Sequence, residues 1–330
     1  MTLLTLDNLQ THFTVKKSWR PNGTDSVLKA VDGVSFSVGE GEVLSLVGES
    51  GCGKSTVGRT LTKLEHATGG AAWFEGTEIT GLSKKSFKPM RRNLQMIFQD
   101  PFASLNPRLT IEQTLSEPLF IHRLAAGRSE AREKVAAILE QVGLSAEVMQ
   151  RHPHEFSGGQ RQRIGIARVM ILKPKLVIAD EPVSALDVSI QAQVINLIKS
   201  LQKQNGVALL FISHDLGVVR HISDRVAVMY LGRIVEIGDK TLVFQQPKHP
   251  YTRLLLASIP RMSRQSSTRE SGDFGEPGNA LDPPQGCAFH PRCPLASEVC
   301  RRVSPILREF GDDHQSACHH AEKLAEVNLA

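Results

Sequence analysis

The sequence predicts an α/β fold with a parallel sheet, and two features support this prediction. Short, almost entirely apolar runs at residues 43–47, 175–179 and 207–212 are typical of buried parallel strands. Two of these runs are followed by segments with apolar residues at helical spacing, at 56–64 and 189–204. Because strands and helices that alternate along a chain form βαβ units, this order favours a sheet with helices packed against it.

The glycine-rich segment 48–56 joins the first of these strands to its helix. Its sequence, GESGCGKST, fits the pattern G-x-x-x-x-G-K-[ST]. Glycines permit positive φ, so backbone N–H groups can point inward and bind an anion together with the free donors of the helix. Lys54 is suited to reach β- and γ-phosphates, and the Ser55 hydroxyl to ligate Mg²⁺. A chance glycine-rich turn is the alternative, which the strand–loop–helix context disfavours. We expect nucleotide contacts from Gly48, Ser50, Gly51, Cys52, Gly53, Lys54, Ser55 and Thr56.

The residues before this loop predict an antiparallel β subdomain. Strand patterns occur at 3–6, 11–15 and 34–38, and the stretch 16–26 contains Pro-Asn-Gly and predicts a loop. Phe13 is an aromatic residue in a polar stretch. It is a candidate platform for stacking an adenine base, and an exposed or half-buried core position is the alternative.

Residues 102–172 predict a mostly helical insert. Short strands at 71–74 and 94–98 precede it, Gln99 follows the second of them, and helical periodicity covers 129–142. Ser157 is suited to cap a further helix that runs to about residue 172. Two glycines in the first turn of this helix cost about 1 kcal/mol each in propensity. Close approach of an anion explains that cost, and a merely capped helix is the alternative.

Acidic and histidine side chains follow two of the buried strands. Asp180 and Glu181 end the strand 175–179, where the Mg²⁺ partner lies in phosphate-loop NTPases, and Glu181 is placed to polarise the attacking water. His214 follows the strand 207–212, at the carboxyl edge where open parallel sheets gather ligands. A capping acidic pair and a structural histidine are the alternatives.

Composition excludes some classes of protein. The net charge of +5, from 39 basic and 34 acidic residues, allows an anionic ligand or a membrane surface but does not indicate a nucleic-acid partner. The hydrophobic content of 41% is typical of a globular chain. No apolar stretch approaches the roughly 18 residues of a membrane-spanning helix, and the first ten residues lack a secretory signal pattern. We therefore expect a cytoplasmic location.

Four of the five cysteines lie in the C-terminal tail: Cys287, Cys293, Cys300 and Cys318. Residues 262–286, rich in Ser, Gly, Pro and charge, predict a linker or irregular arm before them. A reducing compartment favours thiols or metal ligands over disulfides. Four thiolates suit an iron–sulfur cluster or Zn²⁺, although the spacing is not the C-x₂-C of common zinc sites. Unpaired thiols are the alternative, and mixed zinc ligation stays open because four histidines lie nearby: His290, His314, His319 and His320.

Taken in order, these stretches resemble the ATP-binding subunits of ABC transporters over about residues 1–245. The segment 48–56 resembles the Walker A loop, Gln99 the Q-loop glutamine and His214 the switch histidine. The remaining matches are the signature at Ser157, Gly158, Gly159 and Gln160, Walker B at Asp180 with the catalytic glutamate Glu181, and the D-loop at Asp187. The resemblance implies a RecA-like core with an antiparallel β subdomain and a helical insert, followed by an irregular Cys-rich region at 246–330.

The resemblance also implies a mechanism in which two such subunits pair head to tail. ATP on the loop of one chain is covered by Ser157 and Gly159 of the other, and Asp187 links the two sites. Ser55, Asp180 and Gln99 serve Mg²⁺, Glu181 and His214 are catalytic, and Phe13 stacks on adenine. Most of the catalysis is positioning and charge stabilisation.

Further stretches add to these motifs: 15–17, 47–56, 104–107, 156–163, 179–188, 249–252 and the start of the tail at 286–289. With them the finer resemblance is to the peptide/nickel importer branch, most closely to the subunits of dipeptide permeases. It implies a related second ATPase, two membrane permease subunits, an extracytoplasmic peptide-binding protein and a peripheral place on the inner membrane. It also implies a [4Fe–4S] cluster on the four tail cysteines. Other solutes (longer peptides, glutathione, haem or nickel), a soluble ABC ATPase that does not transport, and a non-catalytic regulatory module are the alternatives.

Overall fold

The computed structural model describes residues 1–15, 25–100, 104–259, 278–311 and 313–325. The chain separates into two compact units, each built from several segments. Unit 1 contains Met1–Leu3, Val38–Val43 and Leu82–Ile212. Unit 2 contains Leu4–Ser37, Leu44–Gly81 and Ser213–Ala330. The glycine-rich loop and the C-terminal region therefore belong to the same unit.

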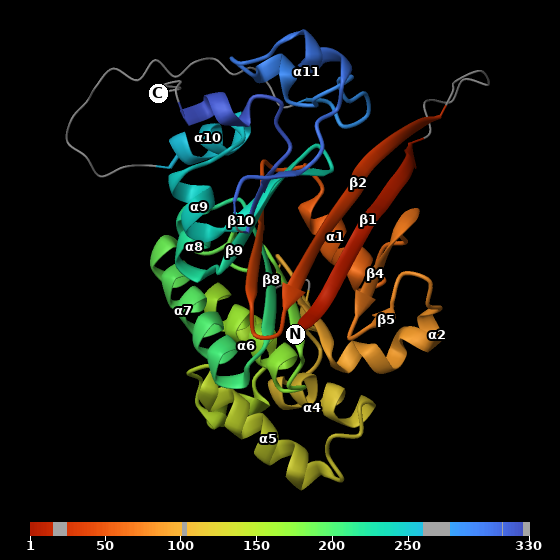
Figure 1. The fold of residues 1–330 in the computed structure, drawn as a ribbon. Coiled ribbons are helices and arrows are strands. Elements are labelled where there is room, and N and C mark those ends of the chain that lie inside the picture. The colour runs from red at the N-terminus through yellow and green to blue at the C-terminus, as the bar shows by residue number, and fades with distance from the viewer. Residues whose placement is uncertain (16–24, 101–103, 260–277, 312, 326–330) are drawn as a thin grey trace, which may run out of the picture. The chain divides into compact units, whose positions relative to one another are not determined.

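Unit 1 is built on parallel strands with helices around them (Figure 1). Strand β7 (Leu176–Asp180) lies between β6 (Leu94–Ile97) and β8 (Ala208–Ser213), and Ala179 is in register with both Ile97 and Phe211. All five residues of β7 are buried, as the continuous apolar run predicts. Over its described residues, the α-helices are α2 (Lys84–Phe87), α4 (Ile111–Ile121), α5 (Arg128–Gln141), α6 (Gly158–Met170) and α7 (Val188–Asn205).

Four of these elements confirm expectations, and α4 was not predicted. Helices α5, α6 and α7 and strand β7 lie within a few residues of the expected ranges, and Gly206 ends α7 in the left-handed conformation with φ 63°. Helix α4 contains Pro118 in its interior, which counts against a helix by propensity. A capping box between Thr110 and Gln113 and the buried Leu115 and Leu119 stabilise it.

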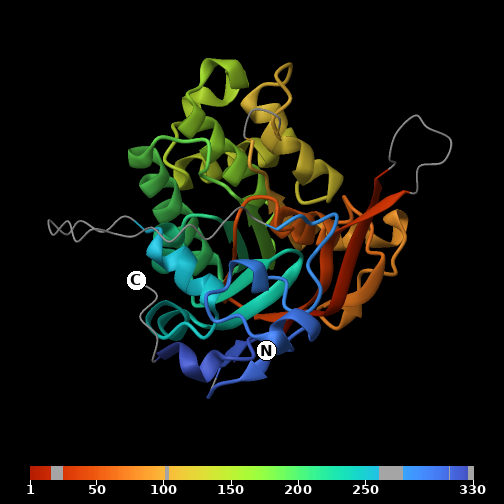
Figure 2. The ribbon, with the colours of Figure 1, turned by 90° about the horizontal axis from the view of Figure 1, so that it is seen from above.

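Unit 2 contains two sheets (Figures 1 and 2). The first has the order β2-β1-β4-β5, formed by Ser26–Gly39, Thr2–Val15, Gly69–Phe74 and Thr77–Glu78. Strand β1 pairs antiparallel with β4, which agrees with the expected antiparallel β subdomain. The two strands expected at 3–6 and 11–15 are one continuous strand, and the loop expected after it lies largely outside the described residues.

The second sheet of unit 2 joins the loop strand to the C-terminal region. Strand β3 (Val43–Val47) pairs parallel with β9 (Arg225–Tyr230), and β9 pairs antiparallel with β10 (Arg233–Asp239). Strand β12 (His314–Ser316) then adds to β10, and β11 (Arg308–Glu309) to β12. The helices of this unit are α1 (Lys54–Leu61), α8 (Leu216–Ile222), α9 (Lys240–Gln245), α10 (Pro250–Ala257) and α11 (Glu298–Arg302). The C-terminal region thus extends a sheet of the unit that holds the loop.

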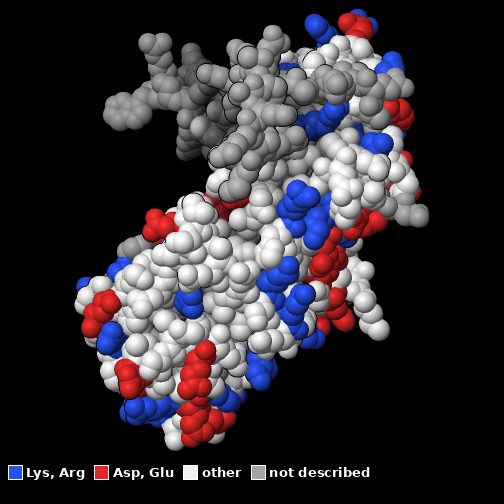
Figure 3. All heavy atoms as spheres, turned by 90° about the vertical axis from the view of Figure 1, so that its left-hand side faces the viewer, with Lys and Arg blue, Asp and Glu red and all other residues white. Residues whose placement is uncertain are grey.

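The surface agrees with the mild net charge. On the face drawn in Figure 3, basic and acidic side chains are interspersed among uncharged ones. Over the described residues, no helix combines the length and apolar character needed to cross a membrane.

Candidate functional site

The glycine-rich loop between β3 and α1 has the backbone that the sequence predicts. Gly48, Gly51 and Gly53 have φ of 154°, 83° and 106°. A Cβ at Gly48 would lie 2.2 Å from the Met229 carbonyl oxygen, and one at Gly53 would lie 1.9 Å from the Ala30 carbonyl oxygen. These two glycines are therefore required by packing of the loop on β9 and β2. Open space lies beside Gly51, where only the positive φ favours glycine.

The start of α1 is suited to an anion. Its N-cap residue is Gly53, and among the described side chains none caps the first N–H groups of the helix. The Lys54 side chain is 4% exposed, and its Nζ donates to the carbonyl oxygens of Gly48 at 2.8 Å and Glu49 at 2.9 Å. The ammonium group is thus held over the loop, next to helix donors that carry partial positive charge.

The other loop residues differ in exposure. Ser50 is exposed, and Ser55 and Thr56 are half-buried. Burial raises the pKa of the Cys52 thiol, although the Lys54 ammonium, 3.8 Å from its sulfur, acts in the opposite direction. Cys52 is therefore a neutral, buried part of the loop. Phe13 is half-buried in β1 of the same unit.

Unit 1 brings Gln99 and Glu181 together. Asp180 is 2% exposed at the end of β7, and Glu181 follows it in the left-handed conformation with φ 44°. The Glu181 N–H donates to the Ile212 carbonyl oxygen at 3.0 Å, which holds this backbone. The Gln99 Nε2 donates to the Glu181 Oε2 at 3.1 Å. A strained backbone held by its surroundings is typical of functional sites, and here it carries the predicted base.

The start of α6 confirms the predicted cap and revises the reason for one glycine. Ser157 Oγ accepts from the Gln160 N–H at 3.4 Å, and Gln160 Oε1 accepts from the Ser157 N–H at 3.1 Å. Gly159 is buried, and a Cβ there would lie 2.6 Å from Cγ2 of Ile190. Packing against α7 therefore requires a small residue at 159, independently of an anion. Gly158 has only an ordinary 3.6 Å neighbour, so packing does not explain it.

The last two predicted nucleotide residues are exposed and stand before helices. Asp187 is the N-cap residue of α7 in unit 1. His214 follows β8 and precedes Asp215, which caps α8 in unit 2 by accepting from the Gly217 N–H at 2.8 Å.

The four tail cysteines are free thiols that influence one another electrostatically. Burial is the main cause that raises the pKa of Cys293 to about 11 and of Cys318 to about 12, and negative charge on the neighbouring cysteines adds to it. The Cys287 N–H donates to the Cys300 carbonyl oxygen at 2.8 Å. Among the described residues, no group of three or more Cys, His, Asp or Glu side chains is arranged to hold a metal ion.

The nearby histidines hold the tail by hydrogen bonds. His290 Nδ1 lies 3.0 Å from the Cys287 carbonyl oxygen, and His319 Nε2 lies 2.9 Å from that of Val303. His320 Nε2 lies 2.7 Å from Ser297 Oγ. His314 Nε2 lies 2.7 Å from Glu236 Oε1 in a buried pair. These contacts assign the rings a structural role in the tail.

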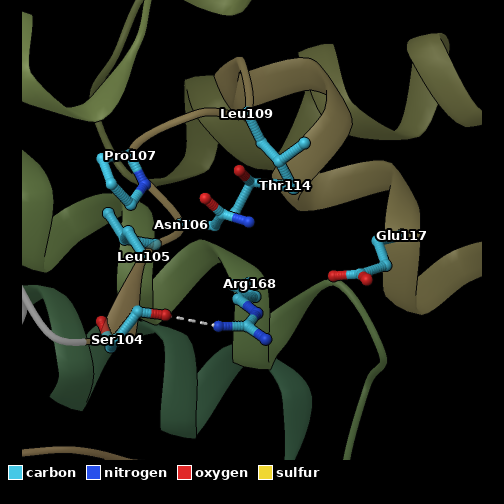
Figure 4. Close-up of a pocket in the computed structure, with 8 residues that line it drawn as sticks. All are labelled: Ser104, Leu105, Asn106, Pro107, Leu109, Thr114, Glu117 and Arg168. Carbon is cyan, nitrogen blue, oxygen red and sulfur yellow. Dashed lines mark hydrogen bonds between the residues drawn. The ribbon is translucent and has the colours of Figure 1, made fainter.

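A hollow of about 350 Å³ lies on the helical insert of unit 1 (Figure 4). In it the Arg168 side chain from α6 donates through Nη1 to the Ser104 carbonyl oxygen at 2.7 Å. A neighbouring groove is lined in part by the exposed Phe98 and Ile121. Phe98 directly precedes Gln99, and Ile121 is the last residue of α4. The hollow is lined by Ser104, Leu105, Asn106, Pro107, Leu109, Thr114, Glu117 and Arg168.

Sequence reasoning missed two residues that hold the loop from the C-terminal region. The Glu49 N–H donates to the Tyr251 hydroxyl at 2.8 Å. Both nitrogens Nη1 and Nη2 of Arg292 donate to the Glu49 carboxylate, at 2.8 and 2.9 Å. Tyr251 stands in a stretch that supported the branch resemblance, but nothing in its pattern points to the loop.

Two family models match the chain. The model described as ABC transporter matches residues 31–184, and the model described as Oligopeptide/dipeptide transporter, C-terminal region, matches residues 235–300. The matches therefore cover both the loop and part of the Cys-rich tail.

Curated relatives match nearly the whole length. The Oligopeptide transport ATP-binding protein AppF of Bacillus subtilis (strain 168) is 50% identical over 324 residues, which are 96% of this chain and 97% of the relative. The Di/tripeptide transport ATP-binding protein DppF of Pseudomonas aeruginosa (strain UCBPP-PA14) is 50% identical over 98% of this chain and 99% of its own. The Oligopeptide transport ATP-binding protein OppF of Escherichia coli (strain K12) is 48% identical over 98% of this chain and 97% of the relative.

Solved structures share the fold of the nucleotide-binding part. A dimeric ATP-binding cassette in a post-hydrolysis state with ADP and Pi aligns with a TM-score of 0.63 and 27% identity, over 72% of this chain and 99% of that one. The structure of cbiO1 from Clostridium perfringens, described as part of the ABC transporter complex cbiONQ, aligns with a TM-score of 0.62 and 26% identity. The alignment covers 74% of this chain and 92% of that one. The expected cassette fold is thereby confirmed.

Proposed function

The chain belongs to the ABC transporter family, in the branch of peptide-importer ATP-binding subunits, and we propose that it powers the import of dipeptides or related small peptides. It binds and hydrolyses ATP, as members of this family do. The similarity to a di/tripeptide subunit over almost the whole chain supports small peptides. The equally similar AppF and the slightly less similar OppF, both named for oligopeptides, keep longer peptides as the second candidate.

The residues of both units have distinct roles in this proposal. Lys54 and the N–H groups of the loop bind the phosphates of ATP, since the loop combines a buried lysine with the uncapped donors of α1. Ser55, Asp180 and Gln99 carry hard oxygen atoms of the kind that would hold Mg²⁺, and the ion would neutralise phosphate charge. Glu181 orients and polarises the attacking water, and His214 stabilises the transferred phosphoryl group. Phe13 stacks on the adenine base.

We propose that the active form is a head-to-tail dimer with a second, related ATPase subunit. Ser157, Gln160 and Asp187 are exposed, so they are available to a partner. Ser157 and Gly159 would approach the nucleotide on the partner's loop, and Asp187 would link the two nucleotide sites across the interface. A solved cassette with 27% identity is a dimer. A lone chain is therefore expected to hydrolyse ATP slowly.

The insert is the proposed contact with the membrane permease subunits. Phe98 is 41% exposed and Ile121 56%, and the two line one groove. Exposed apolar side chains that lie together on a surface mark interaction sites. Phe98 is adjacent to Gln99, which contacts Glu181. This chain of neighbours would connect the permease to the proposed base. The complex would contain two permease subunits and an extracytoplasmic peptide-binding protein, with this chain peripheral on the cytoplasmic face of the inner membrane.

The tail cysteines are the proposed ligands of a [4Fe–4S] cluster. Four free thiols that influence one another electrostatically suit a [4Fe–4S] cluster, which takes one thiolate on each of its four irons. Zn²⁺ on the same thiols remains the alternative ligand set. Iron, sulfide and zinc analysis after anaerobic purification tests this: about four irons and four sulfides per chain support it, and zinc or no metal contradicts it.

The contact between Gln99 and Glu181 is the observation that supports hydrolysis most directly, and Glu181→Gln is its test. ATP turnover is measured with the partner ATPase and permease subunits present. We expect turnover to fall by at least about 100-fold, while ATP still binds and the closed dimer accumulates. Glu140→Gln on the exposed side of α5 is the matched control and should keep wild-type turnover. Unchanged turnover in Glu181→Gln would remove the base assignment.

Peptide import is tested in vesicles that contain the whole complex. Uptake of a labelled dipeptide that requires ATP supports the first solute class, and uptake of longer peptides alone supports the second. Uptake of neither class, with full ATPase activity, would contradict peptide import.

A further inference from the structure

Glu49 of the nucleotide loop is held by the C-terminal region through both its backbone and its side chain. Its N–H donates to the hydroxyl of Tyr251, which lies in the first turn of α10. Its carboxylate accepts two parallel hydrogen bonds from Arg292. Such two-point pairing of a guanidinium with a carboxylate fixes orientation as well as distance. The two contacts come from residues that are 41 positions apart in the chain.

The two anchoring residues are themselves firmly held. The Arg292 side chain is 8% exposed and Tyr251 is completely buried. The Arg292 guanidinium lies over the rings of Tyr230 and Phe289, at 5.9 and 5.6 Å from their centroids. The three rings contact each other, with Tyr230 and Tyr251 centroids 4.7 Å apart. Arg292 is therefore a fixed positive charge that packing presents to the loop.

The position of Glu49 bears on nucleotide binding in two ways. Lys54 Nζ donates to the carbonyl oxygen of Glu49, so a shift of this residue moves an acceptor of the phosphate-binding lysine. The Glu49 carboxylate also places a negative charge in a loop whose proposed ligand is a triphosphate. Arg292 neutralises that charge, and without it the half-buried carboxylate would repel the ligand.

We propose that Arg292 is a positioning residue for ATP: it cancels the charge of Glu49 and fixes the loop, so that the C-terminal region completes the nucleotide site. This inference rests on the proposed ATP binding by the loop and assigns a role to a region beyond the nucleotide motifs. Tyr251 acts with it by fixing the backbone of the same residue.

The test is equilibrium binding of Mg-ATP to the full chain and its variants. Arg292→Gln should weaken ATP binding by about tenfold, because it leaves an uncompensated carboxylate beside the phosphates. Glu49→Gln should bind ATP at least as tightly as the wild type. The double variant Glu49→Gln with Arg292→Gln should recover most of the affinity, since neither charge is then unpaired.

Two further readouts separate this electrostatic role from a loss of structure. The loss in Arg292→Gln should be larger for ATP than for ADP, because ATP carries more negative charge, and it should shrink as salt is raised. Arg292→Lys keeps the charge and should show a smaller loss. Arg302→Gln, which removes an exposed arginine of the same region, is the matched control and should bind ATP normally.

The outcomes are distinguishable. A wild-type chain that does not bind ATP would refute the proposed function itself. If the wild type binds ATP and Arg292→Gln binds it with the same affinity, the role of Arg292 is overturned. It is also overturned if the double variant binds ATP as weakly as Arg292→Gln does. If Arg292→Gln fails to fold, the comparison of Arg292→Lys with wild type for ATP and ADP decides the question in the same way.

Discussion

The amide of Gln99 donates a hydrogen bond across 3.1 Å to the carboxylate of Glu181, although 82 positions separate the two residues. Gln99 lies two residues after the end of β6, and Glu181 directly follows β7, the parallel neighbour of β6. The carboxyl ends of adjacent parallel strands meet at one edge of a sheet, so the register of the two strands produces this contact. The contact connects the proposed base with a residue that lies just before the helical insert.

Replacement of Gln99 by alanine should therefore impair turnover more than nucleotide binding. The variant loses a contact that orients Glu181, whereas the phosphate loop stays intact. We expect turnover in the assembled complex to fall by about tenfold or more, with ATP affinity changed less than threefold, as measured by ATPase assay and equilibrium binding. Gln95→Ala, four positions earlier and within β6, is the control. An equal loss in affinity and turnover would show that Gln99 serves binding instead.

Alanine at Gly53 should destabilise the chain more than alanine at Gly51. Both have positive φ, which costs an alanine about 1 kcal/mol. At Gly53 the new Cβ would also lie 1.9 Å from the Ala30 carbonyl oxygen, whereas open space lies beside Gly51. Urea unfolding of the nucleotide-free proteins compares the two. Equal losses of stability would mean that the loop does not pack on β2 as described.

The stability of the protein should fall in acid because of His249. Burial lowers the pKa of this histidine to about 3 in the folded chain, from 6.5 when exposed. As pH falls from 6.5 toward 3, the unfolded chain binds a proton that the folded chain excludes. The free energy of unfolding should then decrease by up to about 1.4 kcal/mol per pH unit from this group.

The variant His249→Asn tests this assignment. His249 Nδ1 accepts from the Tyr251 N–H at 3.1 Å, and an asparagine oxygen can accept the same bond at the start of α10 without titrating. The free energy of unfolding of this variant, measured in urea, should decrease less steeply below pH 6.5 than that of the wild type. His66→Asn, which removes an exposed histidine, should show the same pH dependence of unfolding free energy as the wild type. If the unfolding free energies of the wild type and His249→Asn decrease with the same slope in acid, other groups cause the acid sensitivity.

The metal-free tail should become less stable in base. Burial raises the pKa of Cys293 to about 11 and of Cys318 to about 12, above the 9.0 of an exposed thiol. As pH rises through 9 toward 11, the unfolded chain loses these protons first, so its free energy falls relative to the folded chain. Stability present below pH 9 is therefore lost across this window.

Alkylation kinetics check the same prediction without unfolding the protein. In the folded, metal-free chain at pH 8, Cys293 and Cys318 should react with iodoacetamide at least about tenfold more slowly than in urea, because the thiolate is the nucleophile. Mass spectrometry of the labelled peptides identifies each site. Rapid labelling of both residues in the folded chain would contradict their burial.

Local sequence determined the elements and the chemistry of the motifs. The run 43–47, the glycine loop and α1 lie within a few residues of one another, and the Ser157 cap needs only Gln160, three positions away. Spacing and side-chain type are sufficient for such features because hydrogen bonds and periodicity act over a few residues. The cassette fold and the peptide-importer branch followed from these motifs in order, and the solved cassettes and the relatives confirm them.

Tertiary structure alone decided how distant segments meet. It placed Gln99 on Glu181, joined β12 to β10 and set Arg292 on Glu49, 243 positions away. It also showed that packing, as much as a ligand, requires glycine at 53 and 159. These contacts depend on strand register and on which side chains fill the space between elements, and neither is encoded in the periodicity of any one segment.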